Sequence, residues 1–283
     1  MYNLGLIGHF ISKSQMPDLI SKLGSEFDVP IKYQLFDLAY KKNIDLKRFI
    51  EKLKKKNFIG LGVTYPYTEK VLGFAEQFGE EVKLTGASNA LLFQNEIIAR
   101  NTDFLGFLKS FNFHFNTAPK KILVIGGGGI GRAVCFALGK LCIEKIYLIE
   151  KDKKKSKELI NQLKKQEINC ISLEVKDLMK IQFNLQGIIN CTPIGHESSL
   201  GNPLPKLVTN KDQWVYDVVY TPAKTDFLKK AESNKSKIIY GIDLFVFQGI
   251  EAFILFTNQE KLRKTIYKKV EEIRSHYFKK LIN

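Results

Sequence analysis

The sequence of 283 residues has few cysteines and no long apolar run. Its four cysteines are scattered and form no Cys-x-x-Cys pair: Cys135, Cys142, Cys170 and Cys191. This spacing favours reduced thiols over a disulfide framework. No apolar segment approaches the roughly 18 residues of a membrane span, and the first residues lack the basic and apolar regions of a signal peptide. We therefore expect a cytoplasmic protein with no membrane partner.

Acidic residues are also scarce, with 29 Asp and Glu against 44 Lys and Arg, which gives a net charge of +15. Nucleic-acid-binding proteins show such a surplus. Here the lysines are spread over amphipathic segments at 41–56, 151–165 and 261–280, without a pattern of interleaved aromatic residues. We expect no nucleic-acid partner, although the positive field favours anionic ligands. The four histidines do not have metal-ligand spacing, so no metal site is predicted.

The segment Lys121–Ala133 contains the clearest motif of the chain. A short β-branched run ends in Gly126, and the glycines at 126, 128 and 131 fit G-x-G-x-x-G. In that motif the glycines permit a tight turn, the approach of a pyrophosphate and close helix–strand packing, while the helix N-terminus attracts the anion. The alternative is a glycine-rich strand–helix turn that binds no nucleotide. A strand at 145–149 ending in Glu150, a possible ribose-binding acid, favours dinucleotide binding.

The apolar pattern predicts an α/β fold with two domains. Expected strands in the first half lie at 3–7, 31–36, 58–63, 90–93 and 97–100, the last two as a hairpin, and expected helices at 12–22, 46–53, 69–78 and 104–111. Expected strands in the second half lie at 121–125, 145–149, 170–174, 187–190, 214–219 and 237–240. Such alternation predicts a mixed sheet followed by a doubly wound Rossmann-type sheet. We expect domains at 1–102 and 103–240, joined near 101–120, with C-terminal helices at 241–283 folding back on the first.

Several motifs together resemble the shikimate/quinate dehydrogenase family. They are Gly5-Leu6-Ile7-Gly8 with Ser14 and Pro17, Gly60 to Tyr67, Gly86 to Leu91, and Asn101-Thr102-Asp103-Phe104-Leu105-Gly106. The second half adds the glycine cluster, Asn190 to Gly195, Asp217 to Pro222 with Thr225, and Gly241 with Gln248 and Gly249. Their order and spacing cover nearly the whole chain. The resemblance implies reversible hydride transfer between a nicotinamide and a ring hydroxyl of a carboxylated cyclohexene.

The same resemblance assigns expected roles to residues. Substrate-binding positions are Ser14, Thr64, Asn89, Asp103, Tyr220 and Gln248. Cofactor-binding positions are Gly126, Gly127, Gly128, Gly129, Ile130, Gly131, Glu150, Lys151, Thr192, Val218 and Gly241. Asp103 falls on one member of the family's catalytic Lys/Asp pair, although it could also serve as a helix N-cap, as could Asn101 or Thr102. His196 could lie near the nicotinamide or have only a structural role.

The substrate half departs from the family pattern at several polar positions. Thr68 stands where the catalytic lysine belongs, and a threonine hydroxyl cannot titrate near neutral pH. Met16, Gly62 and Lys13 replace a serine, an asparagine and a histidine. Lys70 would point to another helix face, whereas Lys13 is an alternative cation. A rebuilt substrate pocket is therefore favoured over a conventional shikimate enzyme, and a non-catalytic nucleotide-binding protein is a further alternative.

The cofactor signals conflict. Glu150 would accept from both ribose hydroxyls and repel a 2′-phosphate, which favours NAD. Lys151 stands where the NADP-using members of the resembled family carry an arginine. Its ammonium could hold a 2′-phosphate. The prediction is NAD or NADP with a preference for NAD, in a monomer or homodimer.

Overall fold

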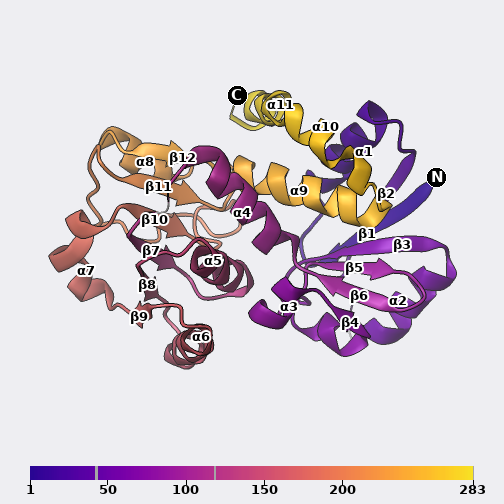
Figure 1. The fold of residues 1–283 in the computed structure, drawn as a ribbon, viewed down its shortest axis with the longest axis horizontal. Helices are drawn as coiled ribbons and strands as arrows, with labels where there is room; N and C mark the ends of the chain where they lie inside the picture. Colours follow the sequence, from indigo (N-terminus) through magenta and orange to yellow (C-terminus); the bar gives the residue numbers. More distant parts are fainter. Residues whose placement is uncertain (42–43, 118, 283) are drawn as a thin grey trace. The chain divides into compact units, whose positions relative to one another are not determined.

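The computed structural model describes residues 1–41, 44–117 and 119–282. The chain divides into two compact units, each of which is described by itself (Figure 1). Unit 1 comprises Met1–Gly106 and Gln248–Val270, and unit 2 comprises Phe107–Phe247 and Glu271–Asn283. The boundaries between the units fall within α4 (Thr102–His114), within α9 (Gly241–Thr257) and after the first residue of α11 (Val270–Ile282).

Unit 1 is built on a six-stranded mixed sheet in the order β2-β1-β3-β5-β6-β4. The strands are β1 (Tyr2–Gly8), β2 (Ile31–Asp37), β3 (Phe58–Val63), β4 (Gln77–Phe78), β5 (Ala90–Phe93) and β6 (Ile97–Arg100). β1 runs parallel to β2 and β3, whereas β5 and β6 form the antiparallel hairpin expected from the sequence. The mixed sheet is therefore confirmed.

Unit 1 contains several short helices, together with the second half of α9. They are α1 (Met16–Glu26), α2 (Leu46–Lys55), the 3-10 helix η1 (Lys70–Phe74), α3 (Glu80–Thr85), the 3-10 helix η3 (Glu260–Leu262) and α10 (Arg263–Lys268). α1 begins four residues later than expected, and Pro17 lies in its first turn, where the missing N–H costs nothing. Asp45 caps α2 by accepting from the Arg48 N–H at 3.0 Å. Residues 42 and 43 of the expected amphipathic segment lie outside the described residues.

The helix expected at 69–78 is wrong. The segment forms η1 and then β4, which adds to the edge of the sheet beside β6. Gly73 weakens the helical pattern, and the backbone after η1 forms hydrogen bonds with β6 instead. The N–H of Glu76 donates to Ile97 at 2.9 Å, and that of Gly79 donates to Ala99 at 2.9 Å.

Unit 2 is a doubly wound α/β layer, as predicted, with six parallel strands in the order β12-β11-β10-β7-β8-β9. The strands are β7 (Lys121–Ile125), β8 (Lys145–Ile149), β9 (Cys170–Ser172), β10 (Gly187–Asn190), β11 (Trp214–Asp217) and β12 (Lys237–Ile239). Its helices include α5 (Gly129–Lys140), α6 (Lys153–Lys165), α7 (Val175–Ile181), the 3-10 helix η2 (Gln182–Asn184), α8 (Asp226–Ser233) and α11 (Val270–Ile282). The strand order reverses between β7 and β10, which places a ligand-binding switch point at their carboxyl ends.

The boundaries of the compact units differ from those expected for the functional domains. The segment 101–120 is mostly helix α4, and residue 118 lies outside the described residues. Among the C-terminal helices, α10 groups with unit 1, whereas α11 from Glu271 onward groups with unit 2. The functional division at residues 102 and 240 stays a prediction. In the described part of the chain, no helix has the length and apolarity needed to cross a membrane.

Candidate active site

The loops that follow β1 and β3 bring Ser14 and Thr64 to the same end of the unit 1 sheet. The Thr64 N–H donates to the Ile7 carbonyl at 2.9 Å, which continues the pairing of the two strands. A side chain at Gly8 would collide with Thr64, because its Cβ would lie 2.3 Å from Thr64 Cγ2. The Ser14 hydroxyl accepts from the Met16 N–H at 3.3 Å, at the entry to α1. The glycine therefore lets the two loops approach closely.

Asn89 and Gln248 are linked through Thr102, the first residue of α4. The amide of Asn89 bonds Thr102 closely: its oxygen accepts from the backbone N–H at 2.7 Å and lies 3.2 Å from Oγ1, and its nitrogen donates to Oγ1 at 3.0 Å. The Thr102 hydroxyl lies 3.1 Å from Gln248 Oε1 and donates to it. The backbone carbonyl of Asn89 accepts from Val63, directly before Thr64. Asn89, Thr102 and Gln248 thus form one polar cluster, and Thr64 follows Val63, the last residue of the strand that pairs with the Asn89 segment. Sequence reasoning had treated Thr102 only as a possible cap.

Asp103 is the second residue of α4 and is not its cap. Asn101 has that role, since its Oδ1 accepts from the Phe104 N–H at 3.1 Å. Asp103 keeps some exposed surface. Desolvation of its carboxyl by the surrounding protein raises its pKa to about 6, and a side-chain hydrogen bond with Asn89 opposes that shift. A carboxyl that titrates near neutral pH beside a polar cluster is suited to exchanging protons.

Thr68 brings a hydroxyl where the resembled family brings an amine. Thr68 is partly buried. Its backbone carbonyl accepts from the Ser88 N–H at 2.8 Å, which places Thr68 next to the Asn89 segment. Lys70 is exposed, and its ammonium lies 6.0 Å from the centroid of the Tyr67 ring. Lys13 is exposed on the loop before α1. Neither lysine occupies the position of Thr68.

The glycine-rich turn of unit 2 has the geometry that a dinucleotide requires. Gly126 has φ +94°, and a Cβ on Gly131 would lie 1.9 Å from the Gly126 carbonyl oxygen. Both positions therefore exclude larger residues. Gly128 immediately precedes α5, and a Cβ there would meet nothing within 4 Å. The space over Gly128 and the N-terminus of α5, including Gly129 and Ile130, fits a pyrophosphate.

Glu150 lies at the end of β8 and is tied to the glycine turn. Its Oε2 accepts from the Gly127 N–H at 2.7 Å, and its Oε1 accepts from the Asp152 N–H at 2.9 Å. The carboxylate is thereby fixed beside the turn in a part-exposed position. Lys151 is exposed. The carboxylate of Glu150 is thus held at the glycine turn by two backbone N–H groups, whereas Lys151 lies on the exposed surface after it.

The turn after β10 carries Thr192 close to the glycine loop, since a Cβ on Gly126 would lie 2.8 Å from Thr192 Cγ2. Asn190 orients the turn by accepting from the Thr192 hydroxyl at 2.7 Å while donating to Asp217 at 2.9 Å. Asp217 is fully buried, and burial raises its pKa to about 6 against hydrogen bonds from Thr225, Val219 and Asn190. Sequence reasoning placed Asn190 and Asp217 in family motifs but assigned them no role.

The remaining expected site residues of unit 2 lie after β11 and at the start of α9. Gly241 packs on the strand end, where a Cβ would lie 2.7 Å from the Val218 carbonyl oxygen. The ring of Tyr220 stacks on Phe245 with centroids 4.7 Å apart. His196 is exposed and bonds the Ser198 hydroxyl at 2.8 Å, a local turn contact.

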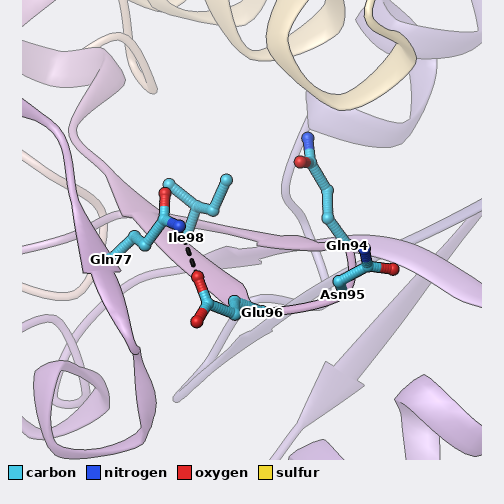
Figure 2. Close-up of a pocket in the computed structure, with 5 residues that line it drawn as sticks. All are labelled: Gln77, Gln94, Asn95, Glu96 and Ile98. Atoms are coloured by element: carbon cyan, nitrogen blue, oxygen red, sulfur yellow. Dashed lines mark hydrogen bonds between the residues drawn. The ribbon is translucent and has the colours of Figure 1, made fainter.

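A surface pocket of about 650 Å³ lies elsewhere, beside the β5–β6 hairpin of unit 1. Figure 2 shows its lining residues, Gln77, Gln94, Asn95, Glu96 and Ile98, with Gln77 donating to Glu96. None of them belongs to the polar cluster. Over the described ranges, no group of three or more His, Cys, Asp or Glu residues could hold a metal ion.

Comparisons with known proteins agree with this geometry. Residues 6–91 match the family model described as the shikimate dehydrogenase substrate binding domain. The chain is 33% identical over 261 residues to a shikimate dehydrogenase (NADP(+)) of Clostridium botulinum, covering 90% of this chain and 96% of that protein. A shikimate dehydrogenase (NADP(+)) of Caldanaerobacter subterraneus is 30% identical, with 94% and 95% covered.

A solved structure of quinate dehydrogenase from Corynebacterium glutamicum in complex with NAD superimposes with a TM-score of 0.87 at 25% identity, covering 98% of this chain and 99% of that one. Shikimate 5-dehydrogenase from Listeria monocytogenes, at 20% identity and a TM-score of 0.84 over 98% and 96% of the two chains, shares the fold. The resemblance noted in the sequence is thus confirmed over nearly the whole chain. The protein belongs to the shikimate dehydrogenase family of NAD(P)-dependent oxidoreductases.

Proposed function

We propose that the protein oxidises a ring hydroxyl of shikimate, or of a closely related carboxylated ring, and reduces the corresponding ketone. The observation that carries this proposal is the polar cluster of Asn89, Thr102 and Gln248 beside Asp103. Hydroxyl and amide groups at fixed positions suit a polyhydroxylated ring. A nicotinamide dinucleotide, which the glycine turn fits, supplies the hydride acceptor or donor.

In the oxidising direction the hydroxyl proton of the substrate passes to the Asp103 carboxylate as the carbon loses its hydride. In the reducing direction the Asp103 carboxyl returns a proton to the new alkoxide. Asn89 orients Asp103 by hydrogen bonding, and Thr68 contributes a hydroxyl donor to the reacting oxygen. Ser14, Thr64 and Tyr220 complete the proposed set of substrate contacts.

The direct test is absorbance at the nicotinamide band with NAD or NADP and either shikimate or quinate. Turnover on shikimate would support the proposal and show that Thr68 and Met16 are tolerated. Nucleotide binding without turnover on either compound would contradict it and favour the second candidate. That candidate is a family member whose substrate pocket is rebuilt for another compound, or one that has no catalytic activity. It is favoured by Thr68, which stands where the resembled family has a lysine.

Lys13 is the proposed alternative cation for the substrate carboxylate or the reacting oxygen. Lys13→Ala is expected to abolish turnover, because no amine stands at position 68. The matched control is Lys22→Ala, which removes an ammonium from the same unit on α1. Initial rates at saturating nucleotide measure the effect. Unchanged kinetics in Lys13→Ala would eliminate this role.

The proposed cofactor is NAD in preference to NADP. Support comes from Glu150, whose carboxylate is held at the glycine turn and would repel a 2′-phosphate. The curated relatives are named for NADP(+), whereas the quinate dehydrogenase structure contains NAD, so the relatives include both.

Glu150→Ala should lower the ratio of kcat/KM for NAD to that for NADP by about 10-fold or more, because the variant loses the carboxylate that would repel a 2′-phosphate. A 10-fold change corresponds to about 1.4 kcal/mol. The exposed Glu158 on α6 supplies a control, because Glu158→Ala changes the net charge equally. A ratio that both variants change equally would mean that the overall field, and not Glu150, sets the preference.

A further inference from the structure

We propose that three exposed aromatic rings beside the substrate loops bind a flat unsaturated group that the substrate carries beyond its carboxylated ring. The rings belong to Phe10, Tyr40 and Tyr65 and are called the aromatic corner. This inference rests on the proposed function, because it extends the same site and narrows its substrate class.

The corner lies at the carboxyl ends of three neighbouring strands. Phe10 follows β1, Tyr40 follows β2 and Tyr65 follows β3, and β1 lies between the other two. The exposed fractions of the three residues are 67%, 86% and 72%. A single exposed aromatic residue needs no explanation, but several gathered at one end of a sheet mark a binding surface. In α/β sheets, this end is where ligands bind.

The backbone holds Phe10 in an unusual conformation. Its φ is +57°, in the left-handed region that side chains other than glycine rarely adopt. Asp37 fixes this loop by accepting the N–H groups of Phe10 at 3.1 Å and Ile11 at 3.0 Å. It also accepts from Ala39 at 3.0 Å, which ties the loop carrying Tyr40 to the same carboxylate. Strain that is maintained by such contacts is typical of functional sites.

The Phe10 ring stands nearly perpendicular to the rings of Tyr40 and His9, and the surface is therefore angled. The centroids of Phe10 and Tyr40 lie 6.0 Å apart at 86°. His9 contacts Phe10 at 6.1 Å and 84° and Tyr65 at 6.4 Å and 90°. His9 is itself held by a 2.9 Å hydrogen bond with the Tyr67 hydroxyl. A flat ring can stack on one face of the corner while its edge meets a second ring.

Two rings of the corner lie on the loops that carry Ser14 and Thr64. Tyr65 is the neighbour of Thr64, and the His9 N–H donates to the Tyr65 carbonyl at 2.9 Å. Phe10 lies on the loop that ends at Ser14. A carboxylated ring held by Ser14 and Thr64 would lie on the same loops as these rings, so that a substituent on it can reach them. The substrate class is a carboxylated ring bearing an aryl or conjugated substituent.

The test compares shikimate with its 4-hydroxycinnamoyl ester as substrates of the full chain, the ester being formed on a ring hydroxyl other than the one that is oxidised, with the carboxylate left free. Phe10→Gly removes the ring and suits the positive φ, so it should fold at least as well as the native protein. Tyr65→Ala is the second variant. Phe183→Ala is the matched control, because Phe183 is 58% exposed in unit 2. The measured quantity is kcat/KM for the ester divided by that for shikimate.

We expect this ratio to exceed one and to fall about 10-fold in Phe10→Gly and Tyr65→Ala, but not in Phe183→Ala. An unchanged ratio in both corner variants would overturn the inference. If neither compound is turned over, the proposed function fails, and the corner is tested separately by calorimetric binding of the ester. Binding that is lost in both variants supports the corner, whereas no binding, or binding that Phe10 and Tyr65 do not affect, overturns it.

Discussion

Asp103→Asn is expected to lower kcat by a factor of about 10² to 10⁴, the usual contribution of a positioned acid or base. An asparagine keeps the shape and the contact with Asn89 but can neither accept nor return a proton. Affinity for the nucleotide should be retained, because the glycine turn belongs to unit 2. Stopped-flow or steady-state rates together with calorimetric nucleotide binding measure the two effects. A variant with native kcat would exclude Asp103 from proton transfer.

The pH dependence gives an independent readout of Asp103. In the proposed mechanism oxidation requires the Asp103 carboxylate, so the rate of oxidation should rise as the pH passes through about 6 and level off above it. Because the folded-state pKa is raised, the protonated carboxyl is favoured by folding, and this stabilisation is lost as the pH rises from about 4 through 6. The free energy of unfolding of Asp103→Asn should therefore exceed that of the native protein increasingly over this range.

Thr68→Lys tests the role of Asp103 by changing a second residue, with Asp103 itself left in place. An ammonium at position 68 would favour the carboxylate and lower the pKa of Asp103, moving the rise in rate to lower pH. Thr68→Met, which has similar length but no charge, is the control. A shift of equal size in both variants would mean that packing, not charge, is responsible.

Gly131→Ala is expected to reduce nucleotide affinity on the order of 10²-fold, since a displacement of about 1 Å at a positioning element costs that much. The added Cβ would lie 1.9 Å from the Gly126 carbonyl oxygen, and backbone atoms cannot move aside cheaply. The turn must open, and the melting temperature should fall with the affinity. Calorimetry and thermal unfolding measure the two quantities.

Gly128→Ala separates binding from folding at the same turn. Its Cβ would meet nothing within 4 Å, so stability should stay native while a bound pyrophosphate is obstructed. Gly73→Ala, which also meets nothing, controls for the added methyl group. Native affinity in Gly128→Ala would show that the pyrophosphate does not lie over Gly128.

The sequence by itself determined every strand except β4, together with the glycine turn and the resemblance to the family. Apolar runs such as Lys121–Ile125 are bounded by glycines and polar residues, so local pattern alone specifies them. Gly126 and Gly131 are similarly local, because the turn they form closes within a few residues. The segment 69–78 failed because an edge strand of two residues depends on pairing with β6, which local pattern does not contain.

Tertiary structure decided which polar residues act together. Asn101, Thr102 and Asp103 are each acceptable caps in the sequence, and only the contact of Phe104 with Asn101 distinguishes them. The bond between Thr102 and Gln248 joins residues 146 positions apart. The raised pKa of Asp103 likewise comes from burial among distant segments. Propensity and spacing act over a few residues, whereas desolvation and side-chain contact depend on what the folded chain brings near.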